Sequence, residues 1–262
     1  MPENRLTPDL HHGFGTRLAE ESGVKPKPMV EIGGKPILWH IMKIYAHYGV
    51  DEFIICCGYK GHMIKEYFAH YFLHTADIAF DLKNNRMDIL RNHAEPWSVT
   101  LVDTGIETMT GGRLARVREY IGDETFCMTY GDGVGNVDIG ALMAWHREQG
   151  TEATLTAVQP LGRFGSFELD PGEERIKVFR EKEKEKGSWI NAGFFVLEPS
   201  VLDLIESDAT TWEREPLETL ADRHQLSAFR HTGFWQPMDT LRDKNFLEDQ
   251  WAEGNPPWKV WS

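Results

Sequence analysis

Glycines and basic residues near the N-terminus could bind phosphate groups. The stretch GFGTRL begins at Gly13, and KPKPM begins at Lys25. Glycines let backbone N–H groups approach phosphate oxygens closely, and Arg17, Lys25 and Lys27 would supply compensating positive charge. The first stretch is neither a Walker A loop nor a dinucleotide GxGxxG motif, because Leu18 stands where the third glycine belongs. Taken alone, it is explained equally well as a glycine turn with exposed cations.

Two aspartates stand where a metal ligand could lie. Asp132 follows the apolar run TFCMTY and is flanked by glycines, while Asp239 follows FWQPM and precedes a helical pattern. An aspartate at the end of a strand is a common Mg²⁺ ligand beside phosphates. An Asp-Gly turn at Asp132 and a helix N-cap at Asp239 are the alternatives. The sequence alone does not bring the two carboxylates together.

A charged run, REKEKEKG at 180–187, directly follows the strand pattern RIKVF. A solvated hairpin tip explains residues 183–186. Glu181 and Lys182 stand at the predicted strand end, and the residues alone leave their role open.

The elements that must position these residues alternate between strand and helix patterns. After residue 160 the pattern changes to short strands, followed by a helical C-terminal part. Alternation in short units predicts a single domain, 1–262, with a mostly parallel sheet flanked by helices and a mixed β extension. Ligands of such sheets bind beyond the carboxyl ends of the strands, which is where several glycine-rich turns fall. The predicted helices cover 35–49, 63–72, 111–122 and 137–150, and the predicted strands 52–58, 98–105, 125–130 and 152–159.

Composition limits the possible partners and location. The net charge of −13 argues against a nucleic-acid backbone or an anionic membrane as the main partner. The three cysteines have no CxxC spacing, which disfavours a zinc site or a disulfide framework. We find no signal-peptide pattern and no apolar run near the ~20 residues that span a membrane, so we expect a cytoplasmic protein.

Several motifs together, in order and spacing, resemble the sugar-1-phosphate nucleotidylyltransferases. The motifs that show the resemblance are GxGTRL, KPKPMVEIGGKPI, CGYKG, YGDGV, FREK, INAGFFV and PMDT. The resemblance covers about residues 13 to 262. The longer stretches DATTWEREPL and GFWQPMDTLRDK are most similar to members that use CTP and glucose 1-phosphate. The resemblance implies a Rossmann-like nucleotidyltransferase sheet, CDP-glucose and pyrophosphate as products, and a homo-oligomer. The Trp-rich tail WAEGNPPWKVW would supply interface anchors or pack on its own core.

The resemblance also implies residue roles. Arg17 would contact the triphosphate, and Lys27 would bridge the α-phosphate and the sugar phosphate. Asp132 and Asp239 would hold Mg²⁺. The nucleotide would lie near Gly13, Gly15, Thr16, Lys25, Lys60, Thr104, Gly111, Gly112 and Arg113, and the sugar phosphate near Glu181, Lys182, Asn191 and Gly193.

The first twelve residues depart from the family pattern, which begins with a short buried strand. This chain has LTPDLHHG there, so His11 and His12 replace small residues and Pro8 cannot donate to a ladder. We therefore expect a degraded first strand. Either the segment is native and alters or abolishes the site, or it comes from a misassigned start or a frameshift.

Three functions follow from these observations. The first is cytidylyl transfer to glucose 1-phosphate. The second is nucleotide binding without catalysis, because of the altered N-terminus. The third is uridylyl or thymidylyl transfer to a sugar 1-phosphate.

Overall fold

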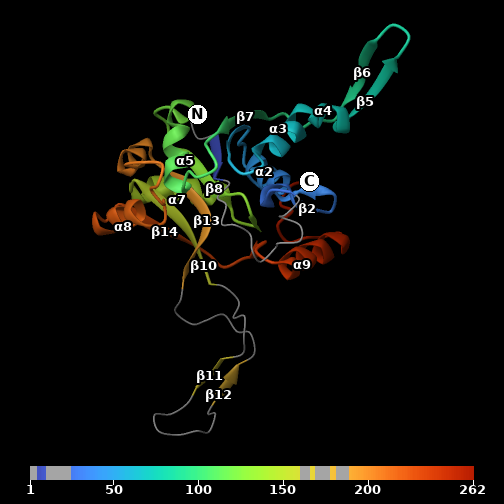
Figure 1. Ribbon diagram of the computed structural model, residues 1–262. Helices are drawn as coiled ribbons and strands as arrows, with labels where there is room; N and C mark the ends of the chain where they lie inside the picture. Colours follow the sequence, from blue (N-terminus) through green and yellow to red (C-terminus); the bar gives the residue numbers. More distant parts are fainter. Residues whose placement is uncertain (1–4, 10–24, 160–165, 169–177, 181–188) are drawn as a thin grey trace.

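A seven-stranded sheet forms the centre of the molecule (Figure 1). The computed structural model describes residues 5–9, 25–159, 166–168, 178–180 and 189–262. The strand order is β14-β10-β13-β8-β1-β4-β7. Neighbouring strands are parallel except around β13, which runs antiparallel to both β8 and β10. The predicted mostly parallel α/β fold is therefore confirmed. The strands are β1 Arg5–Asp9, β4 Glu52–Cys57, β7 Ser98–Asp103, β8 Phe126–Tyr130, β10 Ala153–Val158, β13 Ile190–Leu197 and β14 Leu226–His231.

Helices cover the sheet and create a hydrophobic core on each face. The side chains of β4 alternate between these cores: Phe53 and Ile55 point to one, Ile54 and Cys56 to the other. This explains why EFIICC is a continuous apolar run. The first core contains residues of α2 Ile37–His47, α7 Ile139–Gln149 and α9 Leu241–Ala252. The second contains residues of α5 Thr110–Arg116, α6 Arg118–Ile121, the 3-10 helix η2 Pro199–Leu204 and α8 Glu215–Asp222.

The first strand is present in the described structure. Arg5–Asp9 lies between β4 and β8 in the middle of the sheet. Its register with β8 continues through Pro8 and Asp9, whereas its register with β4 covers Arg5 and Leu6 only. Proline lacks the N–H that a ladder needs. The described residues thus include a first strand, and its expected degradation stays a prediction.

Small ladders attach the remaining segments. β2 Glu31–Ile32 pairs with β3 Lys35–Pro36 beside the 3-10 helix η1 Lys27–Met29. β9 Gly133–Gly135 pairs with β15 Trp235–Pro237. β11 Ser166–Glu168 pairs with β12 Val178–Arg180, within the predicted mixed β extension. Predicted helix 63–72 is divided into α3 Gly61–Ala69 and α4 Tyr71–Thr75.

A β-hairpin that the sequence reading did not predict extends away from the body (Figure 1). Its strands are β5 Ala76–Asp81 and β6 Arg86–Asn92. The hairpin carries exposed large apolar side chains, which are Phe80, Leu82, Met87, Ile89 and Leu90. Exposed apolar side chains gathered on one projecting element are typical of an interaction surface.

The Trp-rich C-terminal tail packs on the core of its own chain. Trp258 is fully buried, and Trp251 and Trp261 pack against the same core as α2. Of the two roles considered for this tail, the structure favours packing over interface anchoring. Among the described residues, no helix is long and apolar enough to cross a membrane.

Candidate active site

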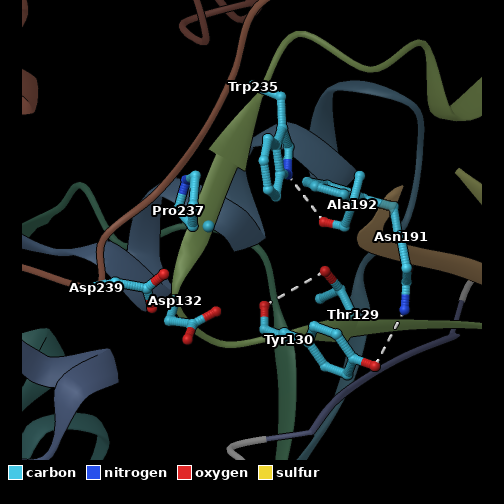
Figure 2. Close-up of a pocket in the computed structure, with 10 residues that line it drawn as sticks. Thr129, Tyr130, Asp132, Asn191, Ala192, Trp235, Pro237 and Asp239 are labelled. Atoms are coloured by element: carbon cyan, nitrogen blue, oxygen red, sulfur yellow. Dashed lines mark hydrogen bonds between the residues drawn. The ribbon is translucent and has the colours of Figure 1, made fainter. Parts of the chain in front are cut away.

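Two loops at the carboxyl end of the sheet bring Asp132 and Asp239 together. Gly131 and Asp132 follow β8, and Gly133 then pairs with Pro237 in the β9–β15 ladder. The backbone N–H of Met238 donates to the carbonyl of Asp132 at 2.8 Å. This ladder fixes the two loops side by side, so that the aspartates lie next to each other at one end of the ladder (Figure 2).

Lys27 lies between the two carboxylates. Its Nζ is 2.6 Å from Asp132 Oδ2 and 2.8 Å from Asp239 Oδ1. The side chain of Lys27 is only 15% exposed, against 29% for Asp132 and 38% for Asp239. Burial disfavours the charged ammonium, but attraction and hydrogen bonds from Asp132 and Asp239 outweigh it and raise the pKa of Lys27. The site thus holds a lysine that stays protonated between two anions.

Asp239 is not the N-cap of α9. Thr240 takes that place, and its side chain forms a reciprocal capping box with Asp243. Asp243 Oδ2 also accepts from the backbone N–H of Asp239 at 3.1 Å. Because the cap is supplied by its neighbours, the Asp239 side chain points to Lys27 instead of the helix end.

A cavity of about 190 Å³ opens beside the aspartates (Figure 2). Trp235 Nε1 donates to the Ala192 carbonyl at 2.9 Å, and Asn191 Nδ2 donates to the Tyr130 hydroxyl at 3.3 Å. The cavity therefore has one acidic side and walls of aromatic and amide groups. Its lining is Thr129, Tyr130, Asp132, Gly133, Asn191, Ala192, Phe194, Trp235, Pro237 and Asp239.

Of the two residues expected near the sugar, Asn191 lines this cavity, and Gly193 contacts two of its lining residues. Asn191 Oδ1 accepts from the Gly193 N–H at 2.8 Å. Gly193 has φ of +80°, and an added Cβ would lie 2.5 Å from the ring of Tyr130. Glycine is required here on both counts. Gly193 thus shapes the wall by letting Tyr130 pack closely.

Thr104 and Arg113, expected near the nucleotide, meet beyond the ends of β4 and β7. The guanidinium of Arg113 donates to Thr104 Oγ1 at 2.6 Å and is 1% exposed. Its Nε has no hydrogen-bond partner among the described residues. A Cβ on Gly58 would lie 2.5 Å from the same guanidinium. Lys60, in the turn after β4, has φ of +51° and lies over the Tyr59 ring.

Gly111 and Gly112 pack against the segment 208–210. A Cβ on Gly111 would lie 2.8 Å from the Thr210 carbonyl oxygen, and one on Gly112 would lie 2.6 Å from Asp208 Cα. Close packing therefore explains why both positions are glycine. Their contact with a nucleotide stays a prediction.

Lys25 pairs with Glu31 and lines a different cavity, of about 470 Å³, together with Tyr67 and His70. Its predicted contact with the nucleotide stays a prediction. Six further predicted residues lie outside the described ranges. They are Gly13, Gly15, Thr16, Arg17, Glu181 and Lys182.

The chemistry of Asp132 and Asp239 suits a divalent cation. Their oxygens already converge on the positive charge of Lys27, and hard divalent cations prefer oxygen ligands. In the part of the chain that the structure describes, no cluster of three or more His, Cys, Asp or Glu side chains could hold a metal. Two carboxylates fit an ion that takes its other ligands from substrate phosphates and water, as Mg²⁺ commonly does.

Sequence reasoning missed several residues that shape this site. Two of them, Tyr130 and Trp235, line the cavity, and Glu213 accepts a hydrogen bond from Tyr130. Asp243 accepts a hydrogen bond from the backbone N–H of Asp239 and so holds that loop. Thr240 and Asp243 form a recognisable capping signal in TLRD. No local signal identifies Glu213, because its contacts are made 83 and 103 residues away.

A family model for nucleotidyl transferases matches residues 10–236. The chain belongs to the nucleotidyl transferase family. It is 61% identical over 253 residues to a glucose-1-phosphate cytidylyltransferase of Salmonella typhi, covering 96% of this chain and 98% of that protein. It is 43% identical over 250 residues to a probable glucose-1-phosphate cytidylyltransferase of Bacillus subtilis, covering 95% and 97%.

Solved structures support the same fold. HddC from Yersinia pseudotuberculosis matches with a TM-score of 0.67 at 21% identity, covering 96% of this chain and 100% of that chain. A UDP-glucose pyrophosphorylase complexed with UDP-glucose matches with a TM-score of 0.66 at 16% identity, covering 97% and 100%. At these identities the likeness concerns the fold.

Proposed function

We propose that this protein transfers a cytidylyl group from CTP to glucose 1-phosphate, forming CDP-glucose and pyrophosphate. The geometric observation that carries the proposal is Lys27 held between Asp132 and Asp239 beside a cavity. The choice of CTP and glucose 1-phosphate is supported by relatives of that name at 61% and 43% identity over almost their whole length.

In this reaction an oxygen of the sugar phosphate attacks the α-phosphorus of CTP. A new P–O bond forms, and the bond to the departing pyrophosphate breaks. Two anions must be brought together, so positioning and charge neutralisation dominate the catalysis. A phosphate monoester is already a competent nucleophile near neutral pH, and no general base is needed.

Lys27 carries the central role. Its raised pKa keeps the ammonium charged, so it can neutralise the α-phosphate and the sugar phosphate as they approach. Arg17 would assist the departing pyrophosphate. On the sugar side, Asn191 lines the cavity, and Glu181 and Lys182 complete the predicted contacts.

Asp132 and Asp239 would hold a divalent cation, for which we propose Mg²⁺. When bound, the ion would neutralise phosphate charge during transfer. These are the two carboxylates that pair with Lys27, so a bound ion would share their negative charge with the ammonium.

The test is release of pyrophosphate with glucose 1-phosphate and Mg²⁺, measured separately with CTP, UTP, dTTP, ATP and GTP. We expect turnover to be fastest with CTP. Faster turnover with UTP or dTTP would assign the protein to another nucleotide. CTP binding by calorimetry with no pyrophosphate from any nucleotide would instead establish a non-catalytic homologue.

We also infer a homo-oligomer, supported by the projecting β5–β6 hairpin with its exposed Phe80 and Leu82. The molar mass of the wild type in solution, measured by light scattering, tests this. The double variant Phe80→Asp/Leu82→Asp should lower that mass without lowering the melting temperature of the body. A monomeric wild type would contradict the inference.

A further inference from the structure

The segment from Asp208 to Glu213 lies across the beginning of α5. The backbone carbonyl of Asp208 accepts a hydrogen bond from the Met109 N–H at 2.8 Å. The carbonyl of Thr210 accepts one from the Gly112 N–H at 3.3 Å. In return the Trp212 N–H donates to Thr110 Oγ1 at 2.8 Å. The segment is part of DATTWEREPL, a stretch that carries the family resemblance, and the proposed reaction gives it no role.

This contact is close because the first turn of α5 contains two glycines that face the segment. A Cβ at Gly111 or Gly112 would lie within 2.8 Å of its backbone. Asp208 adds a paired contact to the guanidinium of Arg116, at 2.9 and 2.5 Å. The first turn of α5, which also carries Arg113, is therefore held by segment 208–213.

Glu213 extends this attachment to the cavity. One carboxylate oxygen accepts from Thr110 Oγ1 at 2.7 Å, and the other accepts from the Tyr130 hydroxyl. Tyr130 also accepts from Asn191 at 3.3 Å, and both of these residues line the cavity. Thr110 is fully buried in the first turn of α5. Glu213 itself is absent from the cavity lining.

We infer that Glu213 is a positioning residue that couples the sugar-side wall, Tyr130 and Asn191, to the nucleotide-side helix α5 through Thr110. The inference rests on the proposed function and on the predicted nucleotide contacts of Gly111, Gly112 and Arg113 in α5. A single carboxylate fixes both hydroxyls, so the two half-sites keep one relative position. Transfer between two bound substrates depends on such alignment, and small displacements of reacting groups reduce the rate steeply.

The chemistry of Glu213 makes graded variants available. A carboxylate accepts from both hydroxyls, whereas an amide has one acceptor oxygen and a donating NH₂ group. Thr110 Oγ1 already accepts from Trp212, and Tyr130 already accepts from Asn191. Glu213→Gln should therefore keep one of the two contacts, and Glu213→Ala should lose both.

The experiment measures kcat, KM for each substrate and melting temperature for Glu213→Ala, Glu213→Gln, Thr110→Val and Thr110→Ser. Glu206→Gln, an exposed glutamate just before the segment, is the control. We expect kcat to fall about ten-fold or more in Glu213→Ala and Thr110→Val, with each KM changing less than about three-fold. Thr110→Ser keeps the hydroxyl and should retain wild-type kcat, and Glu213→Gln should be intermediate.

Two results would overturn the inference. One is a wild-type kcat in Glu213→Ala or Thr110→Val. The other is Thr110→Ser losing as much as Thr110→Val, since this would show that the hydroxyl link is not what matters. If kcat of the Glu213→Ala/Thr110→Val double variant falls by less than the product of the two single-variant decreases, the two residues act through the same hydrogen bond, which supports the inference. If Glu213→Ala does not fold, the two Thr110 variants decide the question alone.

Failure of the proposed function is recognised separately, in the wild type. If the wild type releases no pyrophosphate with any nucleotide, the proposed function is wrong and the variants are compared by calorimetry. CTP is then titrated with and without glucose 1-phosphate. The inference is supported if glucose 1-phosphate changes the affinity of the wild type for CTP and this effect is lost in Glu213→Ala. It is overturned if glucose 1-phosphate has no effect on CTP affinity in the wild type, or if the effect is the same in Glu213→Ala.

Discussion

Lys27 Nζ lies 2.6 Å from Asp132 Oδ2, although 105 residues separate them in the chain. The same ammonium lies 2.8 Å from Asp239 Oδ1, and Asp239 is 212 residues from Lys27 in the chain. A lysine thus lies between the two carboxylates that would hold a divalent cation. The ammonium and a bound ion would both draw on the negative charge of these two carboxylates, and this makes the first prediction specific.

Lys27→Met should lower kcat by about 10²–10³-fold, because it removes a preorganised positive charge from the reacting phosphates. It should also tighten Mn²⁺ binding to the free protein, since the carboxylates lose their bound cation. Pyrophosphate release and Mn²⁺ titration by electron paramagnetic resonance measure the two effects. Lys43→Met is the matched control, because Lys43 is 17% exposed and pairs with Glu95. Weaker Mn²⁺ binding in Lys27→Met would contradict this reading of the site.

Asp243→Ala should reduce both stability and activity, whereas Asp138→Ala should reduce stability alone. Both residues contribute to a helix N-terminus: Asp243 in the capping box of α9, Asp138 as the N-cap of α7. Losing such a contact costs about 0.5–2 kcal/mol. Only Asp243 also holds the Asp239 backbone.

Urea unfolding and kcat measured at several Mg²⁺ concentrations separate these two variants. We expect Asp243→Ala to need more Mg²⁺ for half-maximal rate. Unchanged Mg²⁺ dependence in Asp243→Ala would show that the Asp239 loop keeps its place without the capping box.

The sheet could be predicted because its signals are local. EFIICC alternates between two cores, so its continuous apolar pattern reports a buried strand directly. The β5–β6 hairpin escaped prediction because half-exposed residues dilute its pattern, as with Phe80 and Ile89. Strand β1 carries Pro8, which disfavours a central strand locally, yet the pairing with β8 includes it.

The candidate site was less predictable, because its geometry is long-range. The positions of Asp132 and Asp239 after strand or turn patterns, together with the family resemblance, indicate a metal-ligating role. Both carboxylates contact Lys27 because the β9–β15 ladder brings their loops together, and no local sequence pattern predicts this ladder. Glu213 is the extreme case: its two partners, Tyr130 and Thr110, belong to different elements, and only the packing of segment 208–213 brings them within reach.

Gly193→Ala should destabilise the protein by about 1–3 kcal/mol and raise KM for glucose 1-phosphate. The backbone at Gly193 has φ of +80°, and the new methyl group would meet the Tyr130 ring at 2.5 Å. Gly150→Ala is the matched control, with φ of +61° and nothing within 4 Å of an added Cβ.

Comparing these two glycine variants separates backbone strain from displacement of Tyr130. Both should lower the melting temperature, and only Gly193→Ala should change KM. An equal KM for the two variants would mean that Tyr130 accommodates the methyl group without moving the cavity wall.

His40 joins α2 to the C-terminal tail and is fully buried. Its Nε2 lies 2.9 Å from the Ile32 carbonyl, and its Nδ1 accepts from Trp258 Nε1 at 3.4 Å. Both ring nitrogens are thus used by a neutral imidazole. Burial lowers the pKa of His40 from 6.5 to about 4, against a smaller opposite effect of the backbone contact with Ile32.

The last prediction follows from this pKa. Between pH 6.5 and about 4 the unfolded chain binds a proton at His40 that the folded chain does not, so the unfolding free energy must fall as pH falls. The full loss from this one group is on the order of 3 kcal/mol.

Urea unfolding at pH 7 and pH 5 measures this loss. The unfolding free energy should change less with pH in His40→Gln than in the wild type, although His40→Gln is less stable at pH 7. His47→Gln, an exposed position on the same helix, should keep the wild-type pH effect. If His40→Gln and the wild type lose equal free energy on acidification, His40 is protonated in the folded state, and the Trp258 contact does not hold it neutral.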